Sequence, residues 1–166
     1  SSFIGTEKGG ILIDCGVSFR RLCTALEVNH IPLSTVQGVF ITHEHSDHIV
    51  GAGVLARKHR IPIYANEATW QTAAMRRLVG DIPPHLRRVF ETENEFYIGD
   101  LGVLPIPIPH DTVEPVAFRI YAGKRSVAVA TDWPRRTISR RTTASPTSPC
   151  SNAAGSRAAT WPATPR

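Results

Sequence analysis

The sequence has few of the features that define secreted or membrane-embedded proteins. Its three cysteines, Cys15, Cys23 and Cys150, are odd in number and widely spaced, and they form no C-x-x-C pair. They suggest no disulfide framework, so a reducing cytoplasm is the expected compartment. No apolar run approaches the roughly 20 residues of a membrane helix, and no basic-then-apolar leader stands at the N-terminus. We therefore expect a cytoplasmic protein that makes no use of a membrane.

Acidic residues are missing from residues 133–166, which hold six arginines. Ile138 is the only aliphatic side chain larger than alanine in this tail, so it has too little apolar surface to fold and is expected to be disordered. Residues 1–132 carry thirteen Lys and Arg against fourteen Asp and Glu, although the whole chain has a net charge of +5. The basic character therefore belongs to the tail and is weak support for nucleic-acid binding by the single domain expected over residues 1–132.

The most informative stretch is T-H-E-H-S-D-H-I-V-G at residues 42–51. His43 and His45 are two residues apart, so an extended backbone would direct both side chains to the same side. Asp47 and His48 follow at the expected start of a helix and would point elsewhere. One turn can then present two groups of ligands, as a site for two metal ions roughly 3.5–4 Å apart requires. A polar surface loop is the alternative, but the run joins an apolar strand directly to an apolar helix.

The ligand types indicate which metals such a site would hold. Imidazole and carboxylate groups without cysteine suit Zn²⁺ and also accept Mn²⁺ or Fe. Further candidates follow later strands. His110 and Asp111 end a proline-rich strand, and Asp132 follows the apolar strand at residues 126–130. Asp14 likewise ends an early buried strand. Alone, each of these acids could be an ordinary loop or turn residue.

The H-x-H-x-D-H run resembles the signature of the metallo-β-lactamase-fold hydrolases. The resemblance implies that His43 and His45 bind the first metal ion, with His110 as its third histidine. It also implies that Asp47 and His48 bind the second ion, and that Asp47 helps to orient the attacking water.

The same resemblance assigns roles to the remaining acids. Asp132 would bridge the two ions. Asp14 would hold the histidine-rich stretch at residues 42–51, here called the metal loop, or would orient a ligand histidine without binding metal itself. Asp111 would orient the ring of His110 or hold its loop. With no histidine after His110, the second ion would lack the later histidine that family members carry.

The pattern of apolar segments predicts an α+β fold. Strands are expected at 2–5, 11–14, 36–41, 61–65, 87–90, 95–98, 101–109, 115–121 and 126–130. Helices are expected at 17–27, 47–59 and 66–78. Prolines at positions 105, 107 and 109 predict that their strand lies at a sheet edge, because proline cannot donate to a ladder. The family fold is a four-layer αββα sandwich, and the resemblance implies its first half plus the start of its second.

The segments IDCG, THEHSDH, ARKHRIPIYA, F-x-I-G-D, PHD and ATD resemble a bacterial branch of DNA 5′-to-3′ exonucleases. The resemblance covers about residues 2–132 and implies a phosphodiesterase that uses a water activated by two zinc ions, with nucleic acid as the substrate. A hydrolase of a thioester or lactam carbonyl is an alternative on the same site. An inactive fragment that binds at most one metal ion is another.

Family members continue with strands and helices where the tail begins. We therefore expect a truncated or frameshifted ending after about residue 132, and a genuine basic arm that touches nucleic acid is the alternative. The oligomeric state stays open.

Overall fold

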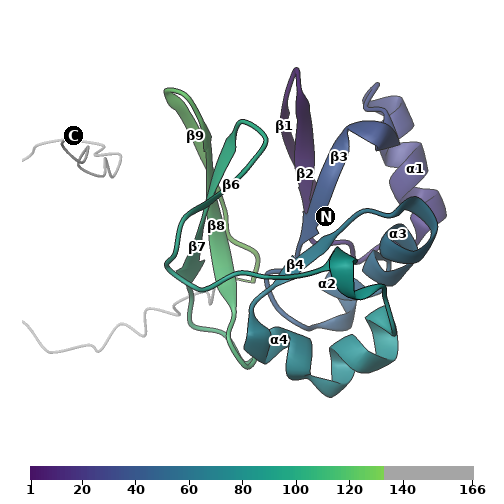
Figure 1. Ribbon diagram of the computed structural model, residues 1–166, viewed down its shortest axis with the longest axis vertical. Coiled ribbons are helices and arrows are strands. Elements are labelled where there is room, and N and C mark those ends of the chain that lie inside the picture. The colour runs from purple at the N-terminus through teal and green to yellow at the C-terminus, as the bar shows by residue number, and fades with distance from the viewer. Residues whose placement is uncertain (133–166) are drawn as a thin grey trace, which may run out of the picture. The chain divides into compact units, whose positions relative to one another are not determined.

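The computed structural model describes residues 1–132. They form two β-sheets that pack face to face, with the helices gathered against the outer face of the first sheet (Figure 1). The predicted α+β class is confirmed, as is the metallo-β-lactamase-type layering of helices, sheet and second sheet. The expectations for residues 133–166 fall outside the described part of the chain.

The first sheet has the strand order β1-β2-β3-β4-β5. β1 (Ser2–Thr6) and β2 (Gly9–Ile13) form an antiparallel hairpin. β3 (Val36–Phe40), β4 (Ile63–Ala65) and β5 (Arg87–Val89) then add in parallel. Every residue of β2 is buried, as expected for a strand covered on both faces. The parallel strands β2 and β3 therefore end at the same edge of the sheet.

The second sheet is antiparallel throughout and follows the chain order. It consists of β6 (Phe96–Ile98), β7 (Leu101–Pro107), β8 (Val116–Ala122) and β9 (Arg125–Val129). The hairpin predicted from the last two apolar segments is confirmed.

Two hydrophobic cores lie on opposite faces of the first sheet because side chains alternate along each strand. Leu12 packs against the helices, whereas Ile11 and Ile13 point between the sheets. Aromatic rings dominate the core between the sheets, where Phe40 meets Phe118 edge to face at 5.7 Å between ring centroids. The strand that leads into the histidine run is thus anchored on both sides.

The helical elements pack on the first core. They are α1 (Phe19–Val28), α2 (Ser46–Ile49), α3 (Ala52–His59) and α4 (Glu67–Gln71), with short turns η1 (Leu33–Thr35), η2 (Met75–Val79) and η3 (Pro84–Leu86). No helix in residues 1–132 is both long and apolar enough to cross a membrane.

The prediction that the proline-rich strand lies at an edge is wrong, because β7 lies between β6 and β8. β6 pairs with β7 only as far as Val103. Pro105 and Pro107 lie beyond that pairing, and the Pro105 carbonyl accepts a hydrogen bond from the Glu93 backbone N–H at 2.9 Å in the loop before β6. The prolines therefore occupy a stretch of an interior strand where a missing N–H breaks no ladder.

The helix predicted for residues 47–59 is two helices, α2 and α3, separated at Val50 and Gly51. The Gly51 backbone N–H donates to the Cys15 carbonyl at 2.8 Å, so the chain docks on the loop after β2 at this point. The helix predicted for residues 66–78 also stops early, at Gln71. There the Thr72 hydroxyl bonds to the Thr69 carbonyl at 2.8 Å, which offers the backbone an alternative to the helix.

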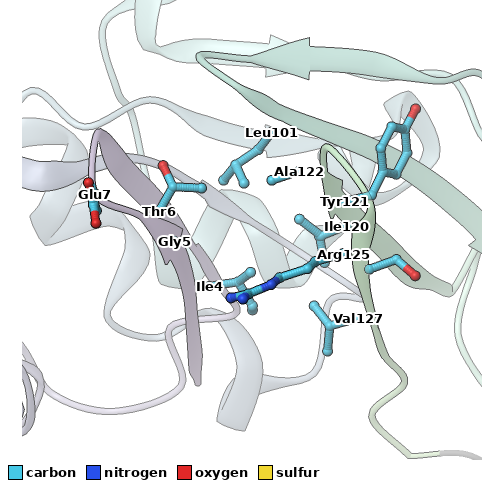
Figure 2. A pocket seen from close by; sticks show the side chains of 11 residues that line it. Ile4, Gly5, Thr6, Glu7, Leu101, Ile120, Tyr121, Ala122, Arg125 and Val127 are labelled. Carbon is cyan, nitrogen blue, oxygen red and sulfur yellow. The ribbon is translucent and has the colours of Figure 1, made fainter.

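A cavity of about 350 Å³ opens between β1 and the β8–β9 hairpin (Figure 2). Ile4, Ile120 and Val127 line it, and the Arg125 side chain extends across it. It lies at the hairpin end of β1 and β2, whereas the histidine run lies at the opposite end of the sheet. None of the predicted metal ligands lines it.

Candidate metal centre

The segments that follow three strands bring the predicted ligands together. His43 and His45 follow β3, and His48 lies in α2 directly after them. His110 follows β7, and Asp132 follows β9. The candidate centre therefore draws on both sheets, at the edge where β2 and β3 end.

The first group of possible ligands consists of His43, His45 and His110, whose ligand atoms lie within 4.8 Å of one another. His43 Nε2 is 3.1 Å from His45 Nδ1. The Nε2 atom of His110 is buried without a hydrogen-bond partner among the described residues. Asp111 Oδ1 lies 3.2 Å from the other ring nitrogen of His110, and this leaves Nε2 directed at the group.

The second group consists of His43, His48 and Asp132. Asp132 Oδ2 lies 2.9 Å from His48 Nε2 and 3.4 Å from His43 Nε2. His43 belongs to both groups and is fully buried. Two overlapping sets of ligands therefore share one imidazole.

Asp47 lies at the rim of the centre. Its carboxylate is 3.7 Å from His48 Nε2 and its side chain is 78% exposed, and it falls in neither of the two groups. Its assignment as a ligand and as the residue that orients water stays a prediction. The bridging role of Asp132 also stays a prediction, because Asp132 falls in one group only.

Asp14 lies beneath the centre and is almost completely buried. Its Oδ1 accepts the Thr42 backbone N–H at 2.8 Å, and its Oδ2 lies 2.8 Å from His48 Nδ1. The carboxylate thus contacts the metal loop at both ends, in line with the role predicted for Asp14. The backbone of Asp14 has φ 58° and that of Asp132 has φ 52°, so both acids at strand ends adopt the left-handed conformation, which is found at many functional sites.

Three residues that contribute to the centre were not among the predicted site residues: Thr42, Thr131 and Glu44. Thr42 is fully buried, and its hydroxyl contacts Asp14, His43 and Thr131. Glu44 Oε1 accepts the Val113 backbone N–H at 3.2 Å and so ties the metal loop to the loop after β7. A threonine at the end of an apolar strand, directly before H-x-H, is the sequence signal that could have identified Thr42.

The electrostatic surroundings favour different protonation states for the two buried histidines. Burial, reinforced by the charge of His48, lowers the pKa of His43 to about 4. Burial also lowers the pKa of His48, but the hydrogen bond to Asp14 and the charges of Asp14, Asp47 and Asp132 outweigh it and raise that pKa. His43 is therefore neutral near pH 7, the form in which a histidine binds a metal.

The metal-free chain should lose stability as the pH falls from 6.5 towards 4. His43 stays neutral in the fold over this range, whereas it takes up a proton in the unfolded chain. Because the unfolded state binds more protons, the free energy of unfolding decreases as the pH falls. The displacement of the His43 pKa from 6.5 to about 4 corresponds to a loss on the order of 3 kcal/mol.

Denaturant titrations of the chelator-treated chain at about pH 7 and about pH 4 measure this loss. The His43→Gln variant is the control, because it has no imidazole to titrate at this position. A variant with the same pH dependence as the wild type would show that His43 does not cause the loss.

The donor set fits divalent metal ions. Imidazole nitrogens with a carboxylate at the edge suit zinc, and the unpartnered His110 Nε2 is a buried donor that a metal would satisfy. Because His43 belongs to both groups, the two groups together supply four nitrogens and one oxygen.

Comparison with known proteins finds similar sequences among bacterial exodeoxyribonucleases. The chain is 37% identical over 130 residues to exodeoxyribonuclease YycJ of Bacillus anthracis, covering 78% of this chain and 48% of that protein. It is 35% identical over 133 residues to exodeoxyribonuclease WalJ of Streptococcus pneumoniae serotype 2, covering 80% and 49%. The chain thus spans about half the length of these relatives.

Solved structures share the fold. The subclass B3 metallo-beta-lactamase MEM-A1 from a soil metagenome library superposes with a TM-score of 0.59 at 22% identity, covering 79% of this chain and 59% of that one. The metallo-beta-lactamase GOB-18 from Elizabethkingia meningoseptica gives 0.60 at 19% identity, with 77% and 53% covered. The family predicted from the H-x-H-x-D-H run is confirmed. Residues 1–138 match the family model of the Metallo-beta-lactamase superfamily, and the chain belongs to this superfamily.

Proposed function

We propose that this chain is a metal-dependent hydrolase that cleaves phosphodiester bonds in DNA. The observation that carries the proposal is the convergence of four histidines and Asp132 in two overlapping groups that share His43. A single structural metal site would need only one such group. Two adjacent groups suit a pair of ions on one substrate, with His43 binding only one of them, because a neutral imidazole has a single lone pair.

Each ion would draw on a different set of side chains. His43, His45 and His110 would hold the first ion, and Asp47, His48 and Asp132 would hold the second. Zinc suits the nitrogen-rich set, and Mn²⁺ or Fe are the alternatives. Bound divalent ions would supply Lewis acidity, which brings the pKa of a water towards 7 and offsets negative charge on phosphate oxygens.

The chain's own residues would prepare this chemistry. Asp14 holds His48 through Nδ1, so that Nε2 faces Asp132. Asp111 contacts Nδ1 of His110, so that Nε2 of His110 faces the first ligand group. Asp47, exposed at the rim, would accept a hydrogen bond from the attacking water and orient it towards the scissile phosphate.

The preference for DNA is supported by the two exodeoxyribonuclease relatives. The described residues have no surplus of positive charge, since residues 1–132 hold thirteen Lys and Arg against fourteen Asp and Glu. Attraction of the phosphate backbone would therefore depend on the metal ions rather than on a basic surface. The lactamase neighbours bear on the fold alone, so a thioester or lactam substrate has no comparable support.

A substrate panel tests the proposal on the full chain. End-labelled DNA, RNA, a thioester and a chromogenic lactam are each incubated with zinc or manganese, and with a chelator as the negative control. We expect metal-dependent cleavage of DNA and loss of cleavage with chelator. His110→Ala should reduce the rate roughly 100-fold or more, the scale of removing one group that stabilises transition-state charge.

His85→Ala is the matched control, because His85 is an exposed histidine outside both groups. It should leave the rate unchanged. Counting the metal ions bound per chain distinguishes a dinuclear site from an inactive fragment that binds one ion at most. Cleavage of the lactam or thioester but not of DNA would contradict the assignment of substrate.

A further inference from the structure

The hydroxyl of Thr42 lies at the junction of the two ligand groups. Its Oγ1 is 2.9 Å from Asp14 Oδ2, 2.9 Å from His43 Nδ1 and 3.1 Å from Thr131 Oγ1. The residue is fully buried, so water cannot replace any of these partners freely. A hydroxyl offers one donor and two acceptor lone pairs. These three contacts therefore use its full capacity.

The direction of each bond follows from what the partners can do. The Asp14 carboxylate only accepts, so the hydroxyl proton of Thr42 points at Asp14 Oδ2. Thr42 must then accept from its other two partners, which makes His43 Nδ1 and Thr131 Oγ1 the donors. His48 Nδ1 also lies 3.4 Å from this hydroxyl, but its proton goes to the closer Asp14 Oδ2 at 2.8 Å.

This arrangement decides which ring nitrogen of His43 carries a lone pair. A neutral imidazole has one N–H and one acceptor nitrogen, and the hydrogen bond to one nitrogen sets the state of the other. With the proton on Nδ1, the lone pair is on Nε2. That atom faces His45 Nδ1 at 3.1 Å and Asp132 Oδ2 at 3.4 Å, where both ligand groups overlap.

We propose that Thr42 is the positioning residue that holds His43 as the tautomer protonated on Nδ1 and so leaves its Nε2 lone pair free to bind a metal ion. Thr131 supports Thr42 through the remaining lone pair. Because Thr131 directly precedes Asp132, the same hydroxyl also ties the end of β9 to the end of β3. The tautomer is a property of the metal-free chain; only its consequence for metal binding rests on the proposed function.

The tautomer can be read in the metal-free, full-length chain from the ¹⁵N chemical shifts of the imidazole nitrogens. Loss of signals in His43→Gln assigns the ring. We expect wild-type His43 to carry its proton on Nδ1. Thr42→Ser keeps the hydroxyl and should keep this state, whereas Thr42→Val has a similar shape without the hydroxyl and should lose it.

Metal affinity provides the second readout. Thr42→Val should weaken zinc binding about 10- to 100-fold, the range for losing a partner that orients a ligand histidine. Thr42→Ser should restore binding to near the wild-type value. Thr131→Val removes only the supporting bond and should have a smaller effect in the same direction.

A wild-type His43 that carries its proton on Nε2 would overturn the proposal, even if no Thr42 variant folds. So would Thr42→Val with wild-type tautomer and zinc affinity. These results are separate from the substrate panel. A chain that has the expected tautomer but cleaves no DNA would refute the proposed function and leave the role of Thr42 standing.

Discussion

Replacing Gly16 with alanine should destabilise the chain by at least about 3 kcal/mol, at the upper end of overpacking costs, and abolish metal binding. A Cβ at this position would lie 1.3 Å from the Asp47 carbonyl oxygen and 2.0 Å from its carbon. Contacts shorter than 3.0 Å are essentially never observed for real Cβ atoms. The obstacle is backbone and not a flexible side chain, so the metal loop itself would have to move.

Such a movement would break the contacts that seat the metal loop on the loop after β2. The Cys15 backbone N–H donates to the His48 carbonyl at 2.7 Å, and the Gly51 N–H donates to the Cys15 carbonyl at 2.8 Å. Both bonds are made by Cys15, the residue directly before Gly16. Displacing the loop would therefore carry His48 away from Asp14 and Asp132, which explains the expected loss of metal.

Denaturant unfolding and metal counting measure the two effects of Gly16→Ala. Gly123→Ala is the control, because a Cβ there meets nothing within 4 Å and only the left-handed backbone, with φ +56°, resists the change. That strain costs about 1 kcal/mol and should leave the metal content unchanged. A Gly16→Ala chain with wild-type stability and metal content would show that the two loops are not in close contact.

Asp14→Asn should cost on the order of 3 kcal/mol or more, because it removes a buried charge that hydrogen-bonded partners depend on. The asparagine oxygen can still accept the Thr42 backbone N–H. Its NH₂ group, however, would face Thr42 Oγ1 and His48 Nδ1, which both need an acceptor. The pKa of His48 should fall, because the Asp14 bond and charge are the largest effects that raise it.

Chemical denaturation of the metal-free chain and an NMR titration of His48 measure both effects of Asp14→Asn. Asp81→Asn is a matched control at an exposed aspartate and should change the stability by less than about 0.5 kcal/mol. An unchanged His48 pKa in Asp14→Asn would contradict the contact between these side chains. Wild-type stability would mean that the carboxylate is not needed to hold the metal loop.

Local patterns along the chain predicted the α+β class and the histidine run, and the family resemblance added the roles of the ligands. The continuous apolar run of residues 11–13 and the β-branched residues of β3 predict buried strands. The histidine run at the end of β3 brings three imidazoles together through chain connectivity alone. His110 and Asp132 each follow a strand, but they could be predicted as ligands only together with the histidine run and the family resemblance.

Tertiary structure decided what no local pattern encodes. The Asp14–His48 contact spans 34 residues and the Thr42–Thr131 contact spans 89, so both exist only because β2, β3 and β9 end at one place. The interior strand β7 can hold Pro105 and Pro107 because β6 stops pairing at Val103, and the division of the predicted helix depends on Cys15. Residue types and spacing determine which side chains can act as ligands. The packing of two sheets determines how those ligands are oriented, because orientation depends on partners distant in the chain.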